Sequence, residues 1–322
     1  MHQKQIGKTD LTVTDISFGC AGIGNIGRAI SDQEAEDVLQ AAWDAGIRYF
    51  DTAPHYGRGR SEERLGSFLK NLDRSSFAIS TKVGRVLSPG PALSEADGFI
   101  DPLPNSVRYD YSGAGFEEAI EQSCQRLQTD TIDILYVHDI GAYTHGAEND
   151  RHMKDFFASG LDKLQELKTS GRIRAYGLGV NETRVCLDIL ARTDLDAILL
   201  AGRLTLLDRD AEAELVGICK GRATSLILGG IFNSGILATG PTEGAWFDYK
   251  PASQDIIEQV TDLQRKTETF GIPLATAALH YAHSHPAAAS VLIGTGKISS
   301  LKRNLAALET PIPTGCQELF GY

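Results

Sequence analysis

The sequence lacks the features of membrane and secreted proteins. No stretch approaches the roughly 18 apolar residues of a membrane span, and the polar N-terminus, residues 1–15, has no apolar run of signal-peptide length. The five cysteines are scattered without a C-x-x-C pair, and their odd number leaves at least one unpaired in any disulfide scheme. We therefore expect a cytoplasmic protein without a disulfide framework.

Positive charge is also scarce. Lysine and arginine number 31 against 42 aspartates and glutamates, which gives a formal net charge of −11. Binding to a nucleic-acid backbone requires clustered cations. We expect a small-molecule partner, with neither nucleic acid nor membrane as a partner, and a monomer or small homo-oligomer.

What the chain does contain is a repeated strand and helix pattern. Its 322 residues are long enough for one large core, although length alone also allows two domains. Apolar runs rich in valine, isoleucine and leucine, typical of strands buried on both faces, occur at 16–19, 49–51, 77–82, 132–138, 173–180, 197–200, 225–228 and 290–293. Helical patterns lie between and after them, near 61–70, 116–128, 160–169, 183–191, 209–220, 255–270 and 299–308.

A further helix is predicted to begin after Ser31, where Ser31 and Glu34 form a capping box. Alternation around a Gly-Lys-Thr-Asp turn in residues 3–14 predicts an N-terminal hairpin. Eight strands that alternate with eight helices predict one domain, residues 1–322, built as an α/β (β/α)8 TIM barrel.

The glycine motif Gly22-x-Gly24-x-x-Gly27 suggests an alternative, a dinucleotide-binding fold with Asp51 as the ribose-binding acid. In that fold the helix begins within the glycine motif, so that its N-terminus meets the pyrophosphate. Here the capping box at Ser31 places the helix start after Gly27. This spacing favours a glycine-rich loop at the mouth of a barrel.

Three connections are unusually long, at 83–114, 139–158 and 230–254. Each follows a predicted strand and precedes a predicted helix, so all three should lie at the C-terminal face of the barrel. Long loops in compact domains are usually functional. The first, with its prolines and its two tyrosines Tyr109 and Tyr111, resembles a lid or specificity loop.

Ionisable side chains gather at the ends of three consecutive predicted strands. Asp51, Lys82 and His138 each close a strand, and Tyr56 follows Asp51 by five residues. Each has an ordinary structural explanation when taken alone. Together they form a coherent acid–base set, because Lys82 can favour the tyrosinate, Asp51 can hold Lys82, and His138 can bond a substrate oxygen.

Histidines elsewhere do not predict a metal site. The spacing of His280, His283 and His285 cannot place all three on one helical face, and Pro286 ends the helix directly after them. His145 and His152 lie in a long loop near acidic residues, where a metal is equally unexpected.

These motifs resemble those of the aldo-keto reductase superfamily. The segments Asp51-Thr52-Ala53-x-x-Tyr56-Gly57 and Ser61-Glu62-x-x-Leu65-Gly66 are similar to its second-strand signature, and Thr81-Lys82 and Val137-His138 to its third- and fourth-strand signatures. The resemblance covers essentially the whole chain. It implies a barrel that binds a nicotinamide cofactor in extended form, with Tyr56 as general acid or base and Asp51, Lys82 and His138 completing a catalytic tetrad.

The resemblance also implies a set of cofactor contacts. The segment after strand 8 corresponds to the family's cofactor-binding segment, Asn181 is expected at the nicotinamide carboxamide, and the loop after strand 7 is expected at the pyrophosphate. The implied contacts are Gly19, Asn181, Gly230, Phe232, Ser234, Gly294, Thr295, Lys297 and Asn304. Ser300 stands where many NADPH-dependent members carry an arginine, which slightly favours NAD over NADP, although Lys297, Lys302 or Arg303 could replace that arginine.

The segments at 199–208 and 229–237 are most similar to the branch of aldose 1-dehydrogenases and pyridoxal 4-dehydrogenases. The implied reaction is oxidation of a cyclic aldose of the L-fucose, D-arabinose or L-galactose type to its lactone, with hydride transfer to NAD(P)+. Alternatives are oxidation of pyridoxal to 4-pyridoxolactone and general reduction of aldehydes or ketones. Outside catalysis, the same barrel would suit a cofactor-binding regulatory subunit similar to potassium-channel β subunits.

Overall fold

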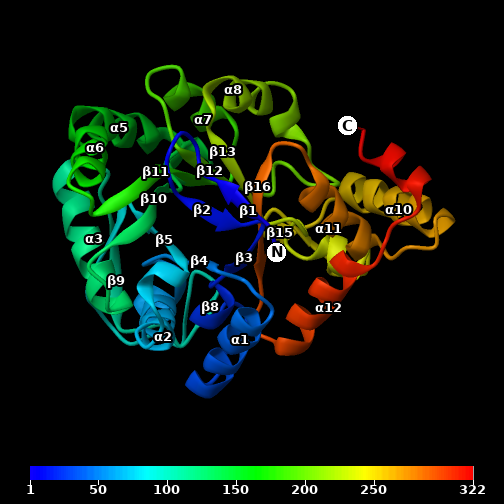
Figure 1. Ribbon diagram of the computed structural model, residues 1–322, viewed down its shortest axis with the longest axis horizontal. Helices are drawn as coiled ribbons and strands as arrows, with labels where there is room; N and C mark the ends of the chain where they lie inside the picture. The colour runs from blue at the N-terminus through cyan, green and yellow to red at the C-terminus, as the bar shows by residue number, and fades with distance from the viewer. Residues whose placement is uncertain (322) are drawn as a thin grey trace.

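The computed structural model describes residues 1–321. Eight parallel strands close into a barrel (Figure 1), which confirms the predicted fold. The strands are β3 (Ile16–Gly19), β4 (Tyr49–Asp51), β5 (Ala78–Val83), β10 (Ile132–His138), β11 (Ile173–Val180), β12 (Ala197–Ala201), β13 (Ser225–Gly229) and β16 (Ala288–Gly294). Each predicted run coincides with a strand, and four of them match both bounds.

The helices lie around the barrel and bury their apolar faces against it. They are α1 (Asp32–Asp44), α2 (Arg60–Leu69), α3 (Gly113–Leu127), α6 (Leu161–Thr169), α7 (Arg184–Leu190), α8 (Leu215–Arg222), α11 (Leu274–Ser284) and α12 (Ile298–Glu309). Between β13 and β16 the chain forms α10 (Gln254–Thr269) as well as α11, which was expected only as a helix ending before Pro286 and was not given bounds. The helix predicted at 209–220 begins only at Leu215, after a short 3-10 turn.

The start of α1 is fixed by the predicted capping box. Ser31 Oγ accepts the N–H of Glu34 at 3.1 Å, and Glu34 Oε2 accepts the N–H of Ser31 at 2.8 Å. The glycine motif before it forms only a 3-10 turn, Gly22–Gly24. The helix start therefore argues against the dinucleotide-binding alternative, as the spacing predicted.

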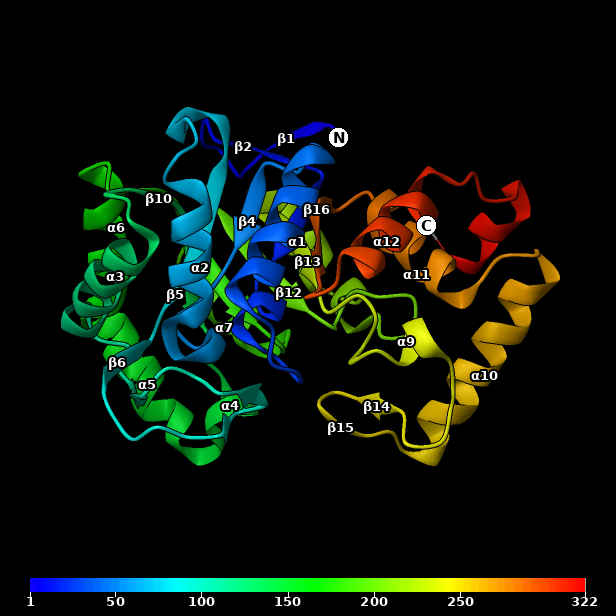
Figure 2. The same ribbon diagram turned by 90° about the horizontal axis from the view of Figure 1, so that it is seen from below.

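The two ends of the barrel differ. The hairpin of β1 (Gln3–Gln5) and β2 (Thr12–Thr14) lies at one end, where Ile6, Leu11 and Val13 pack into the inner core with Tyr49. Figure 2 shows this hairpin at the top and the long connections at the bottom. The bottom is the C-terminal end of the strands, the end at which barrel enzymes carry their sites.

Each long connection contains regular structure of its own. The first forms two hairpins, β6 (Arg85–Pro89) with β9 (Asn105–Tyr109) and β7 (Glu95–Ala96) with β8 (Phe99–Ile100). The second forms α4 (Ala142–His145) and α5 (Asn149–Asp155). The third forms α9 (Ile236–Thr239) and the hairpin of β14 (Trp246–Phe247) and β15 (Lys250–Pro251). Within the described residues, no helix combines the length and apolar character that a bilayer crossing requires.

Candidate active site

A cavity of about 400 Å³ opens at the C-terminal end of the barrel. Its floor comes from strand ends, including Lys82, His138 and Asn181. All three long connections contribute to its wall, with Asp97 and Phe99 from the first, Tyr143 and Thr144 from the second, and Tyr249 from the third. The prediction that these connections lie together at the C-terminal face of the barrel is confirmed.

The structure brings together the four residues predicted at the strand ends. Lys82 Nζ lies 2.8 Å from Asp51 Oδ2, 2.8 Å from the carbonyl oxygen of Thr52 and 3.3 Å from Tyr56 Oη. The ring centroids of Tyr56 and His138 are 6.0 Å apart. Adjacent strands β4, β5 and β10 place Asp51, Lys82 and His138 side by side.

Asp51 is fully buried and has two donors for its carboxylate. Ser80 Oγ donates to Oδ1 at 2.7 Å while Lys82 donates to Oδ2. Tyr49 extends this buried chain by donating to Ser80 Oγ at 3.0 Å. A buried carboxylate needs such partners to stay charged, so the network supports an Asp51–Lys82 ion pair.

The electrostatics of Lys82 and Tyr56 are set by burial and by each other. Burial alone would lower the pKa of Lys82, but the neighbouring charges of Asp51 and Tyr56 raise the pKa above its usual value. For Tyr56 burial is the larger effect and raises the pKa, while Lys82 offsets part of the rise. Lys82 therefore acts in the expected direction, yet Tyr56 keeps its proton near neutral pH.

Two neutral histidines face the tyrosine. Burial holds the pKa of His138 well below its usual range, and Arg85 and Lys82 lower it further. His55 lies with its ring 5.9 Å from that of His138, and burial lowers its pKa to about 2. Within the described residues, the Nδ1 atom of each histidine is buried without a hydrogen-bond partner.

Sequence reasoning missed several residues of this cavity. His55 stands directly before Tyr56, and Asp139 directly after His138, so both could have been found as neighbours of a predicted site residue. Phe99, whose ring stacks on Tyr56 at 5.9 Å, and Tyr249 come from connections whose sequence carries no recognisable pattern. Their position depends on tertiary contacts.

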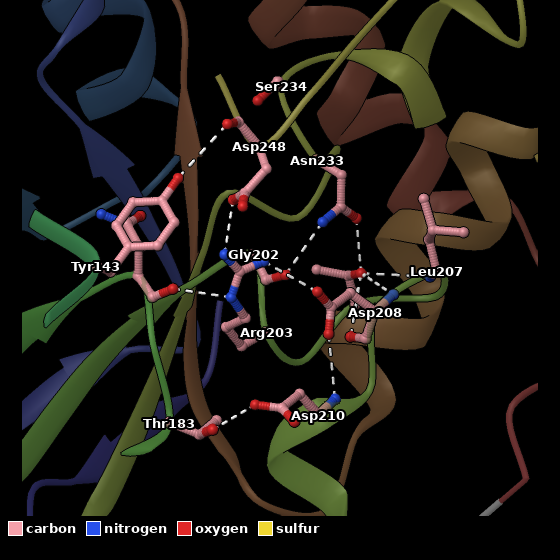
Figure 3. Close-up of polar contacts among 12 residues, drawn as sticks. Tyr143, Thr183, Gly202, Arg203, Leu207, Asp208, Asp210, Asn233, Ser234 and Asp248 are labelled. Atoms are coloured by element: carbon pink, nitrogen blue, oxygen red, sulfur yellow. Dashed lines mark hydrogen bonds and ion pairs between the residues drawn. The ribbon is translucent and has the colours of Figure 1, made fainter. Parts of the chain in front are cut away.

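One of these contacts ties the third connection to the strand ends. Figure 3 shows Arg203 between Asp208 and Asp248, which it bonds at 2.9 and 2.7 Å. Arg203 Nε also donates to the main-chain oxygen of Asn181 at 2.8 Å. Arg203 thereby holds the β14–β15 hairpin, and with it Tyr249, beside the cavity.

A second groove, of about 340 Å³, adjoins the first and shares Ala21 and Ile26 with it. The predicted contacts Gly294, Thr295 and Lys297 line this groove together with Gly22. The groove lies at the start of α12, where no side chain caps the helix. The amides of Ile298 and Ser299 stand at the very start of the helix, where the helix offers no acceptor, and with Lys297 they form a donor set that fits a phosphate group, so these residues fit the cofactor that the sequence implied.

The other predicted cofactor contacts are placed as follows. Asn181 lines the main cavity. Gly19 ends β3 and pairs with Gly294. Ser234 Oγ accepts the N–H of Tyr249 at 2.9 Å. Gly230, Phe232, Ser234 and Asn304 lie on the wall of neither cavity.

The C-terminal histidines point to separate partners. His280 contacts the main-chain oxygen of Ala307, His283 pairs with Asp15, and His285 contacts Glu212. In residues 1–321 no group of three or more histidine, cysteine or acidic side chains could hold a metal ion.

Comparison with known proteins places these observations in context. The model of the aldo/keto reductase family matches residues 15–315. A pyridoxal 4-dehydrogenase from Microbacterium luteolum is 38% identical over 97% of this chain and 94% of its own, and a D-threo-aldose 1-dehydrogenase from a Pseudomonas species is 36% identical over 94% and 92%. Among solved structures, an aldo-keto reductase from Bacillus halodurans in its holo form superimposes with a TM-score of 0.76 at 26% identity, covering 99% of this chain and 96% of that one.

Proposed function

The chain belongs to the aldo/keto reductase family of oxidoreductases, and from that premise we propose that it oxidises a cyclic aldose at C1 to the lactone with NAD(P)+. The observation that carries the proposal is the contact of Lys82 with Tyr56 at the cavity wall, beside His138. The similarity to a D-threo-aldose 1-dehydrogenase supports the substrate class.

Each side chain has a role in this reaction. Tyr56 accepts the proton of the C1 hydroxyl, and Lys82 stabilises the phenolate that does so. Asp51 holds Lys82 in place by the 2.8 Å ion pair. His138, which is neutral, donates a hydrogen bond to the reacting oxygen. A nicotinamide cofactor, when bound, supplies the hydride acceptor.

The same residues indicate where the cofactor is held. Asn181 in the main cavity is proposed to contact the carboxamide, while Thr295, Lys297 and the first amides of α12 are proposed to contact a phosphate. We favour NAD, because position 300 carries a serine whose Oγ accepts from Arg303 at 3.4 Å. Arg28, near the same groove, is paired with Glu34 at 3.4 Å.

Pyridoxal is the second candidate substrate. It exists as a cyclic hemiacetal and undergoes the same oxidation, and a pyridoxal 4-dehydrogenase is among the similar proteins. The stacked rings of Phe99 and Tyr56 offer a flat apolar wall that suits a pyridine ring. The carboxylate of Asp97 on the same cavity instead favours a substrate with several hydroxyl groups.

An absorbance assay at 340 nm tests both candidates. L-fucose, D-arabinose, L-galactose and pyridoxal are each tested with NAD+ and with NADP+. We expect NAD(P)H formation with at least one aldose. Activity with pyridoxal alone would favour the second candidate, and tight cofactor binding without turnover of any substrate would favour a regulatory subunit.

A further inference from the structure

Asp139 occupies an unusual position directly after His138. Its backbone adopts a left-handed conformation, with φ of 49°, and its side chain is only 12% exposed. The backbone N–H of Asp139 still donates to Gly179 at 2.9 Å, so the chain turns at this residue without leaving the barrel ladder. This turn directs the carboxylate back across the strand ends, beside the cavity that it lines.

Three side chains converge on that carboxylate. Arg85 Nη2 donates to Oδ2 at 2.6 Å, and Asn181 Nδ2 donates to Oδ1 at 3.1 Å. The Nε2 atom of His138 lies 3.4 Å from Oδ2. Asp139 therefore touches one residue proposed to face the substrate and one proposed to face the cofactor.

A carboxylate only accepts hydrogen bonds, and this fixes the orientation of both neighbours. The amide of Asn181 must turn its Nδ2 toward Asp139, which directs Oδ1 away from it; Oδ1 accepts the hydroxyl of Tyr249 at 3.4 Å and has a second lone pair for another donor. The neutral ring of His138 is more stable with its proton on Nε2, opposite the carboxylate, than on Nδ1. The 3.4 Å separation from Oδ2 is longer than an ordinary hydrogen bond, so the Nε2 proton of His138 remains available to a substrate oxygen, while Oδ1 of Asn181 can accept a carboxamide N–H.

Arg85 favours the charged form of this carboxylate. Its side chain is 6% exposed and forms no hydrogen bond through Nε or Nη1 within the described residues. Burial raises the pKa of Asp139 above its usual value, and among its neighbours Arg85 opposes this rise most strongly. The guanidinium also lies over the ring of Tyr109, 5.4 Å from its centroid, but within the described residues its hydrogen bonds reach only Asp139, and a buried cation in this position favours the ionised carboxylate.

Building on the function proposed above, we propose that Asp139, held by Arg85, is a positioning residue that sets both the tautomer of His138 and the amide orientation of Asn181. One side chain thereby couples the substrate side and the cofactor side of the site. The contact with Asn181 is a directional hydrogen bond, and the contact with His138 is a polar approach at 3.4 Å, so neither depends on apolar packing.

The first test is Asp139→Asn, which keeps the size and removes the charge. We expect kcat to fall and the Kd for NAD(P)H to rise, each by about 10–100-fold, the range for residues that orient a functional side chain. The matched control is Asp133→Asn at the other end of β10, where Asp133 is 4% exposed and bonded to Arg74 at 2.7 Å. That variant should lose stability without changing kcat or Kd.

The second test needs no substrate, so it stands even if no aldose is oxidised. Nitrogen-15 spectra of histidine-labelled protein, with His138→Gln to assign the signal, report which ring nitrogen carries the proton. In the wild type we expect the proton of the His138 ring on Nε2. In Asp139→Asn this preference for Nε2 should be lost. In Arg85→Lys, which keeps the cation, the preference should be retained. An unchanged tautomer together with unchanged kcat and Kd in Asp139→Asn would overturn the proposal.

Discussion

Lys82 Nζ lies 3.3 Å from the phenol oxygen of Tyr56 and 4.7 Å from the centroid of its ring, although 26 residues separate the two in sequence. The buried ion pair with Asp51 fixes the ammonium in this place. Its charge is thus available to a tyrosine that reaches the cavity, while Lys82 itself is only 2% exposed. The predictions below follow from this arrangement and from the residues around it.

The first prediction concerns the proton carrier. We expect Tyr56→Phe to reduce kcat by at least about 10²-fold, the usual contribution of a positioned acid or base. The Kd for NAD(P)H should stay nearly unchanged, because the phenylalanine ring keeps the stacking with Phe99. Steady-state rates and a fluorescence titration measure the two quantities. Retained activity would show that Tyr56 is not the acid–base residue.

The second prediction concerns pH. Burial raises the pKa of Tyr56 above the value near 10 of a free tyrosine, so little phenolate is present at neutral pH. Below its pKa, the fraction of Tyr56 present as phenolate increases about tenfold per pH unit. Initial rates of oxidation should therefore rise with pH through about pH 9, whereas carbonyl reduction, which uses the phenol, should not. An oxidation profile that levels off below about pH 8 would contradict this assignment.

The third prediction concerns stability. Lys82→Met leaves Asp51 buried without its cation, and we expect a loss of about 3–5 kcal/mol in the free energy of unfolding. The double variant with Asp51→Asn should recover part of this loss, because no unpaired charge remains. Urea unfolding measures both. The exposed pair of Arg222 and Asp194 provides the control, since Arg222→Met should cost about 1 kcal/mol or less.

The barrel and the grouping of Asp51, Tyr56, Lys82 and His138 at its C-terminal end could be predicted because their sequence signals are local. The run Ile132–His138 is apolar enough to be buried on both faces, and its predicted bounds match β10. The contacts of the connections are long-range. Arg85 reaches Asp139 across 54 residues, and the short strand β8 is held by the amide of Asn25, which donates to Ile100 at 3.0 Å. The local sequence of such a long connection does not show which distant side chain will bond to it.

The fourth prediction concerns acid. His55 and His138 have lowered pKa values in the folded protein, whereas an unfolded histidine titrates near 6.5. Below that pH the unfolded state binds more protons, so stability falls as pH decreases, by about 1.4 kcal/mol per pH unit for each histidine. Unfolding of the wild type and of His55→Phe between about pH 7 and pH 5 should show a smaller slope in the variant. Equal slopes would show that His55 is not buried as a neutral ring.

The last prediction concerns the β14–β15 hairpin, which carries Tyr249 to the cavity. The two central residues of its turn, Asp248 and Tyr249, both have positive φ, at 54° and 60°. Such a turn is unfavourable for residues other than glycine, asparagine or aspartate, so it needs support from outside. Arg203 provides that support by its 2.7 Å bond to Asp248.

We therefore expect Asp248→Ala to loosen the hairpin while the barrel stays intact. Amide hydrogen exchange in residues 246–251 should become faster. KM should rise more than kcat falls, because Tyr249 lines the cavity and, in the part of the chain that the structure describes, forms no hydrogen bond with Asp51, Tyr56, Lys82 or His138. Asp194→Ala removes an arginine partner at an exposed site and should leave both readouts unchanged. Unaltered exchange in Asp248→Ala would mean that apolar contacts, such as those of Phe247 with the neighbouring core, hold the hairpin. Arg203 would then stabilise only its other partners, Asn181 and Asp208.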